Sequence, residues 1–102
     1  MEHYLFRIKS IVEHLEKRPG MFLVSNTFNA FINFLGGYTM AIYEAEGFSF
    51  DRAFSEWLAE KYNLSPALAW HAQILHKTNK NEEAALNLVF LEINAYLNYL
   101  SA

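Results

Sequence analysis

Two apolar helical patterns in this chain meet at one corner, Lys17-Arg18-Pro19-Gly20-Met21-Phe22-Leu23. Lys17 and Arg18 suit the negative end of a helix macrodipole, and Pro19 cannot continue the backbone hydrogen-bond ladder. Gly20 can adopt a turn that a residue with a side chain would resist. The apolar run that follows, residues 21–24, is expected to fold back onto the core. The corner therefore predicts that one helix ends here and that the chain turns into a second.

Apolar residues recur on both sides of this corner at the spacing of amphipathic helices. We expect helices over residues 3–17, 28–46, 50–62, 66–77 and 82–100. No segment shows the sustained two-residue alternation of a half-buried strand. The sequence therefore predicts an all-α fold: one domain over residues 1–102, built as a compact bundle of about five helices with short connections.

Three local features add expectations about these helices. The second helix is apolar around much of its circumference, so we expect it to lie centrally. Gly36 and Gly37 in its middle each cost roughly 1 kcal/mol relative to Ala, which predicts close packing of another helix there, or a kink. Ser65 followed by Pro66 is typical of a helix start. The expected buried stripe of the helix that begins there is Leu68, Ala72 and Leu75.

Composition excludes several classes of protein. With 53% hydrophobic and 17% aromatic residues, the chain can build an ordered core. Its formal charge of −3 does not favour binding to nucleic acid, and the absence of Cys excludes disulfides and thiolate chemistry. The first residues lack a signal-peptide pattern, and the longest apolar segment, residues 28–43, is too short and too interrupted to span a bilayer. We therefore expect a cytoplasmic protein without a membrane partner.

Metal binding and catalysis have weak support in the sequence. His71 and His76 are five residues apart, not at the four-residue spacing of paired ligands on a helix. No nucleophile elbow, phosphate loop or paired-carboxylate motif occurs, although a Ser/His/acid triad can form from any spacing. We expect no metal, no cofactor and no enzymatic activity.

Acidic residues gather between positions 44 and 60, where Arg52 is the single cation. Such a zone would attract a basic partner, but it is also typical of an ordinary solvated face. Trp70 and Tyr99 fall away from the expected buried stripes and are candidates for interface anchors. The last three acids, Glu82, Glu83 and Glu92, have no basic residue after Lys80. The acids of the central zone are Glu44, Glu46, Asp51, Glu56 and Glu60.

The corner also carries a family resemblance. Arg18-Pro19-Gly20-Met21-Phe22-Leu23 precedes a helix with a Phe34-Leu35 pair and a Gly37-Tyr38 pair. This order resembles that of a widespread group of small bacterial proteins with an RPGM-aromatic-Leu corner. The later block over residues 54–62, with the pattern F-x-x-W-L-x-x-x-Y, is similar to a second motif of the group. Val24 departs from the small residue that often follows the leucine.

The group looks like the immunity proteins of bacterial toxin systems, including contact-dependent growth inhibition. The resemblance implies a stoichiometric inhibitor that binds, one to one, the toxic C-terminal domain of a large exported protein. Many such toxins are nucleases with basic clefts, so it implies a basic nuclease partner, a ribonuclease above all, whose active site is occluded. No catalytic residue carries over. The residues of the corner carry over as structural, whereas the toxin-binding surface does not carry over at all.

Two other functions remain open from the sequence. The long apolar stripe over residues 86–100 would allow a homodimeric interaction or scaffold protein, paired across a two-fold axis. A nucleic-acid-binding regulator built on helical hairpins is the third possibility, although the net negative charge argues against it.

Overall fold

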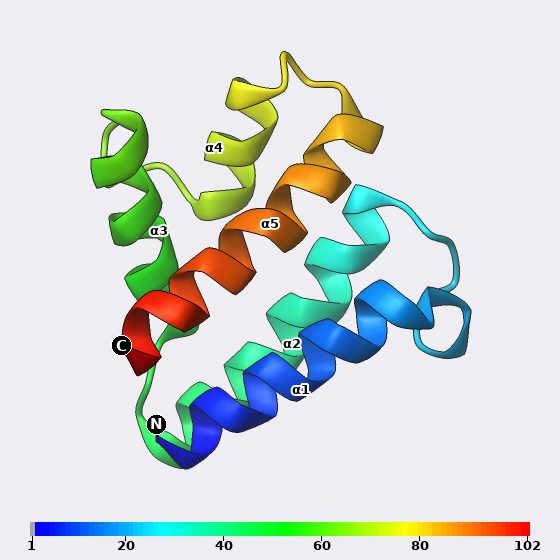
Figure 1. Ribbon diagram of the computed structural model, residues 1–102, viewed down its shortest axis with the longest axis vertical. Helices are drawn as coiled ribbons and strands as arrows, with labels where there is room; N and C mark the ends of the chain where they lie inside the picture. Colours follow the sequence, from blue (N-terminus) through cyan, green and yellow to red (C-terminus); the bar gives the residue numbers. More distant parts are fainter. Residues whose placement is uncertain (1) are drawn as a thin grey trace.

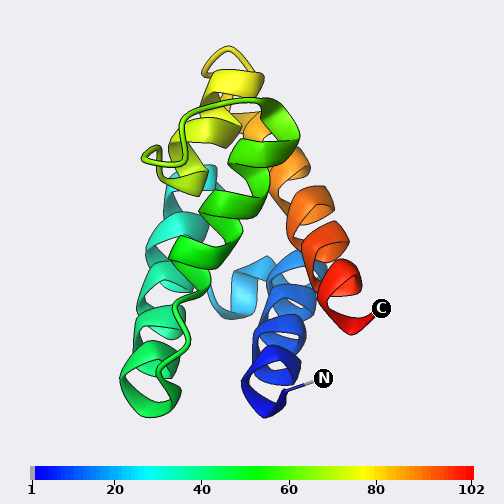
Figure 2. The same ribbon diagram turned by 90° about the vertical axis from the view of Figure 1, so that its left-hand side faces the viewer.

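The computed structural model describes residues 2–102, which fold into five α-helices and one 3₁₀ turn. No strand occurs within these residues, so the predicted all-α bundle is confirmed. In both ribbon views, the start of α1 and the end of α5 lie near one another (Figures 1 and 2). The elements are α1 (His3–Lys17), η1 (Pro19–Met21), α2 (Phe28–Glu46), α3 (Phe50–Tyr62), α4 (Trp70–Lys77) and α5 (Glu82–Ser101).

Local capping contacts set most of the helix ends. The side chains of Thr27, Ser49 and Asn81 each accept a hydrogen bond from the backbone N–H three residues further on. Each such cap contributes about 1 kcal/mol to helix stability. Gly47 and Asn63 end α2 and α3 in the left-handed conformation, with φ of 78° and 57°. These ends are encoded by residues next to them in sequence, and the predicted bounds of α2 and α3 are confirmed.

The corner ends α1 where the sequence predicts. Helix α1 stops at Lys17, and the N–H of Arg18 donates to the carbonyl of His14 at 2.8 Å. Beyond it, the carbonyl of Pro19 accepts the N–H groups of Phe22 and Leu23 at 3.1 and 2.8 Å. The carbonyl of one proline therefore holds the turn closed.

Two expectations about the corner are wrong in detail. Gly20 does not have a positive φ, and a Cβ at Gly20 would meet nothing within 4 Å, so the turn does not require glycine. The apolar run folds back only in part: Leu23 is buried and Phe22 is half-buried, whereas Met21 and Val24 are exposed. The 3₁₀ turn Pro19–Met21 itself buries no residue.

The central helix is α5, not α2 as predicted (Figure 1). Helix α5 packs against each of the other four α-helices, whereas α2 leaves one side uncovered, along Asn29, Asn33 and Gly37. The apolar residues of α2 are numerous, but its asparagines and glycines share a face and make it amphipathic. The buried residues of α5 are Ala85, Val89, Phe90, Glu92, Ile93, Tyr96 and Leu97.

Helix α4 begins at Trp70, four residues later than the predicted start at Pro66. The Ser65-Pro66 pair forms a turn instead, in which the N–H of Leu68 donates to the carbonyl of Ser65 at 3.1 Å. The start of α4 is set by a tertiary contact, because the N–H of Trp70 donates to the hydroxyl of Ser55 on α3 at 2.8 Å. The face that α4 buries is consequently Trp70, Gln73 and Ile74, not the predicted Leu68, Ala72 and Leu75.

The glycine pair in α2 has no close neighbour. Helix α2 is uninterrupted from Phe28 to Glu46, and a Cβ at Gly36 or Gly37 would meet nothing within 4 Å. The prediction that another helix of this chain packs closely against them is therefore wrong.

This open position leads to a stability prediction. Gly36→Ala and Gly37→Ala should each raise the free energy of unfolding by about 0.5–1 kcal/mol, because alanine loses less backbone entropy on folding. Gly47→Ala is the matched control and should lower it, since φ at Gly47 is 78°. Urea denaturation followed by circular dichroism measures all three. Destabilisation by both helix-interior substitutions would contradict the open packing described above.

Candidate interaction surface on helices α3 and α5

The five predicted acids are all exposed, but they occupy three separate places. Glu44 and Glu46 lie on the last turn of α2, and Asp51 lies on the first turn of α3. Glu56 and Glu60 are four residues apart on α3 and therefore share one face. At a rise of about 1.5 Å per residue, Glu60 lies about 15 Å along the axis from the start of α3. The acidic zone of the sequence is thus not a single patch.

Asp51 and Trp70 hold α3 and α4 together. The indole N–H of Trp70 donates to the Asp51 carboxylate at 3.0 Å, and Trp70 is only 2% exposed. Its ring packs against that of Phe54, with 5.8 Å between the centroids. The prediction of Trp70 as an exposed anchor is wrong, because the buried face of α4 is rotated from the one that the sequence pattern indicated.

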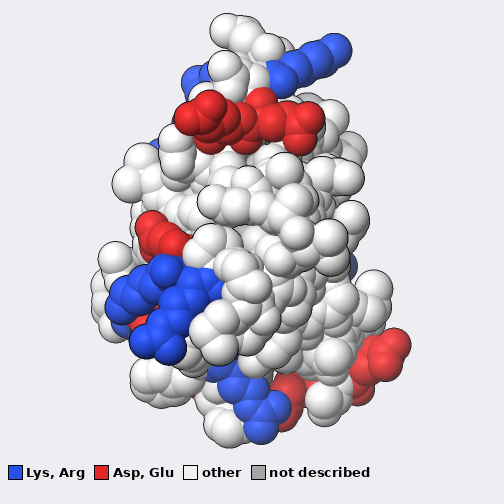
Figure 3. All heavy atoms as spheres, turned by 90° about the vertical axis from the view of Figure 1, so that its right-hand side faces the viewer, with Lys and Arg blue, Asp and Glu red and all other residues white. Residues whose placement is uncertain are grey.

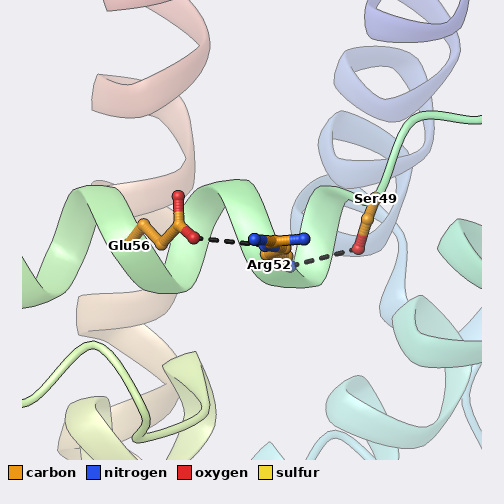
Figure 4. Close-up of polar contacts among 3 residues, drawn as sticks. All are labelled: Ser49, Arg52 and Glu56. Atoms are coloured by element: carbon orange, nitrogen blue, oxygen red, sulfur yellow. Dashed lines mark hydrogen bonds and ion pairs between the residues drawn. The ribbon is translucent and has the colours of Figure 1, made fainter.

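Arg52 partly neutralises one of the two remaining acids of α3. Its guanidinium lies 3.2 Å from the Glu56 carboxylate, one turn away on the same helix (Figure 4). Both side chains are well exposed, so the pair stabilises the helix by only a few tenths of a kcal/mol, as an order of magnitude. The same figure shows the Ser49 hydroxyl that caps the helix start. Glu60 has no ion-pair partner among residues 2–102.

An exposed aromatic residue lies beside these acids. Tyr99 on α5 is 63% exposed, as expected of an interface anchor, and its ring centroid is 6.2 Å from that of Trp57 on α3. Burial first, and then the nearby Tyr99 and Glu56, raise the pKa of Tyr96 above its ordinary value. Glu56 precedes Trp57 on α3, and the ring centroids of Trp57 and Tyr96 are 5.2 Å apart. We call the surface formed by Glu56, Trp57, Glu60 and Tyr99 the α3–α5 surface.

The α3–α5 surface contains a groove of about 430 Å³. It is lined by Trp57, Glu60, Lys61 and Tyr99, so it combines two aromatic rings with one carboxylate and one ammonium group. The Nζ of Lys61 lies 5.2 Å from the Trp57 ring centroid, in a cation–π contact. The fold therefore brings two of the predicted partner-binding residues, Glu60 and Tyr99, to one groove, and Glu56 lies one turn from Glu60 on the same face of α3.

A buried carboxylate supports this surface from beneath. Glu92 on α5 is 3% exposed; it accepts a hydrogen bond from the Tyr62 hydroxyl and lies 2.5 Å from the Nζ of Lys61. The burial of Glu92 and its pairing with Lys61 were not predicted from the sequence, where only the absence of a basic residue after Lys80 was evident. The position of Glu92 supplied a signal, since it lies three residues after Val89 and four before Tyr96, inside the apolar stripe. A lone acid in such a stripe needs a partner.

Two other parts of the surface are largely apolar or uncharged. A groove of about 500 Å³ beside α4 is lined mainly by apolar residues, including Leu64, Leu68 and Leu75. Residues 21–43 contain no charged side chain, and the face seen on the side of the α1–α2 corner is broadly uncharged between its acidic and basic groups (Figure 3). Among residues 2–102, no three His, Cys, Asp or Glu side chains are grouped to hold a metal ion. Within the same residues, no helix combines the length and apolarity that crossing a membrane requires.

Comparisons of the chain with protein-family models, with curated proteins and with solved structures found no match. The resemblance to immunity proteins therefore stays a prediction from the sequence motifs.

The buried Glu92 makes stability depend on pH in the alkaline range. Burial, and next the hydrogen bond and charge of Glu92, raise the pKa of Tyr62 well above its ordinary value. A raised pKa in the folded state favours the protonated phenol, so its contribution is complete below about pH 10 and is lost as the pH rises further. Tyr62→Phe should make the decline of the unfolding free energy above pH 10 shallower, by up to about 1.4 kcal/mol per pH unit.

Chemical denaturation at several values between pH 8 and pH 11.5 measures this slope. Tyr43→Phe is the matched control, because Tyr43 is exposed on α2. Equal slopes for the two variants would show that Glu92 does not hold the Tyr62 phenol as described.

Proposed function

We propose that this chain is an immunity protein of the contact-dependent growth inhibition type, which neutralises a cognate toxin domain by occluding its active site. The target is a basic nuclease, a ribonuclease in the simplest form of the proposal. The observation that carries it is the α3–α5 surface, where the exposed Glu60 and Tyr99 line one groove and the exposed Glu56 lies one turn before Glu60 on α3. The resemblance of the Arg18–Leu23 corner supports the same proposal.

Physical complementarity explains why this surface suits such a target. A nuclease cleft is positively charged because it must bind a phosphate backbone. Exposed carboxylates speed the encounter with such a cleft, and a neighbouring aromatic residue supplies an anchor that desolvates well. A specific complex of this kind would bury on the order of 1,600 Å² in total. The inhibitor acts by covering the cleft in the cytoplasm of the recipient cell and contributes no catalytic group.

The other candidates for toxin contact have different roles in this proposal. Glu44 and Glu46, on the end of α2, steer the toxin from a distance. Asp51 is engaged by the Trp70 indole, so it contributes charge but not a free carboxylate. Glu56 and Glu60 form the direct ion pairs with cations of the toxin.

Charge reversal on α3 tests the proposal. The double variant Glu56→Lys with Glu60→Lys should slow association with the toxin domain about tenfold at low salt and weaken the salt dependence of the rate. The matched control is Glu13→Lys with Glu16→Lys, which makes the same change in net charge on exposed positions of α1. Stopped-flow binding to the toxin domain encoded beside this gene measures the rates, and co-expression measures rescue of growth.

Rescue by the wild-type chain and by the α1 variant, with loss of rescue by the α3 variant, is the expected pattern. Rescue of equal strength by all three would remove the α3–α5 surface from the proposal. Failure of the wild-type chain to protect cells from any neighbouring toxin domain would remove the function itself.

A homodimeric interaction protein is the second candidate, and one observation favours it. Most of the apolar stripe of α5 is buried inside the domain, so the dimer expected from residues 86–100 would have mainly Leu91 and Tyr99 exposed there. The uncharged residues 21–43 instead leave Met21, Val24 and Met40 exposed. Two copies could meet on this side without charge repulsion despite a net charge of −3 each.

Light scattering at concentrations from 1 to 100 µM, roughly the range in which weak dimers form, separates the two candidates. The immunity proposal expects a monomer throughout. A dimer that dissociates when Met40→Lys is introduced, but not with Tyr99→Lys, would favour the second candidate instead.

A further inference from the structure

We infer that the groove of the α3–α5 surface is a binding site for an arginine side chain of the partner protein. The groove of about 430 Å³ is lined by the aromatic residues Trp57 and Tyr99 and by the charged residues Glu60 and Lys61. A guanidinium group stacked on the Tyr99 ring would be able to pair with Glu60. The identity of the partner rests on the proposed function, whereas the chemistry of the site rests on the groove alone.

The aromatic walls are suited to a cation. The Lys61 ammonium already lies 5.2 Å from the Trp57 ring centroid, so this ring accepts a positive charge within the protein itself. The Tyr99 ring, tilted by 39° to that of Trp57, is 63% exposed and carries no such cation among residues 2–102. A cation is attracted to the face of an exposed aromatic ring, and the attraction is stronger when the cation is desolvated.

The charges around the groove leave one carboxylate free. Lys61 is paired with the buried Glu92 at 2.5 Å, and Arg52 is paired with Glu56 at 3.2 Å. Glu60 has no partner in the described chain, and its exposed carboxylate lines the groove. An incoming cation would therefore meet an uncompensated negative charge, although the Lys61 ammonium opposes it in part.

Arginine fits these groups better than lysine. A guanidinium group is planar, stacks on aromatic faces and forms two parallel hydrogen bonds to a carboxylate. An ammonium group is a strongly hydrated point charge, and Lys61 already fills the ammonium position over Trp57. The groove thus combines an exposed aromatic ring with a carboxylate. A guanidinium group can use both at once, whereas an ammonium group cannot stack on the ring.

The test uses the whole ¹⁵N-labelled chain and two short peptides, acetyl-Gly-Arg-Arg-Arg-Gly-amide and its lysine counterpart. The indole N–H signals supply a reporter and an internal control, because Trp57 lines the groove and Trp70 is buried with its N–H bonded to Asp51. The arginine peptide should shift the Trp57 signal and leave that of Trp70 in place. It should also bind at least about threefold more tightly than the lysine peptide.

Variants assign the binding to individual groups. Glu60→Gln and Tyr99→Leu should each lower the affinity for the arginine peptide about fivefold. The first removes the charged carboxylate that pairs with the guanidinium, and the second removes the aromatic face on which it stacks. Leucine keeps apolar cover over Trp57, so this variant separates loss of the aromatic face from loss of packing. Glu13→Gln and Tyr43→Leu, on exposed positions of α1 and α2, are the matched controls and should bind like the wild-type chain.

Equal binding of the two peptides would overturn the inference, as would binding that survives both groove variants. The toxin-binding experiment and the peptide experiment test different claims, so their results are interpreted separately. If Glu56→Lys with Glu60→Lys abolishes toxin binding but the arginine peptide leaves Trp57 unmoved, the arginine site is wrong and the immunity function stands. If the peptide binds as described but no toxin is neutralised, the site stands and the function is wrong.

Discussion

The structure depends on the burial of one face of α5. Each of the other four α-helices packs against this helix, so its apolar residues are shared by the whole core. Ile93 and Leu97 are at most 1% exposed, and full burial of such a side chain stabilises a fold by about 1.5–3 kcal/mol. A helix in this position cannot also present its apolar stripe to a second chain. Most of the residues that the sequence indicated as a dimer interface are therefore buried in the core of the domain.

One polar group inside this face links the core to the candidate surface. Glu92 occupies a position that would otherwise be apolar, and it is satisfied by the Tyr62 hydroxyl and the Lys61 ammonium on α3. Removal of either partner would leave a buried charge less compensated, which is strongly unfavourable. The same contact fixes the register of α3 on α5, and it holds Lys61 over Trp57. The geometry of the groove thus follows from a buried charge beneath it.

Features that depend on neighbouring residues could be predicted. The bounds of α1, α2 and α3 were predicted correctly, because the ends of these helices depend on residues within a few positions of them. The exposure of Tyr99 could also be predicted, because a helical stripe defines its own outer side. The start of α4 could not, since the Ser55 hydroxyl on another helix overrides the capping signal of Ser65.

The sequence by itself determined that this protein is a helical bundle, because hydrophobic periodicity and capping act over short distances along the chain. It also determined which acids carry the negative charge. Only the tertiary structure decided which helix lies at the centre, that Trp70 and Glu92 are buried, and that Glu56, Glu60 and Tyr99 share one surface. These outcomes depend on the rotation of each helix about its axis when several amphipathic faces must be buried together, and no local pattern specifies that rotation.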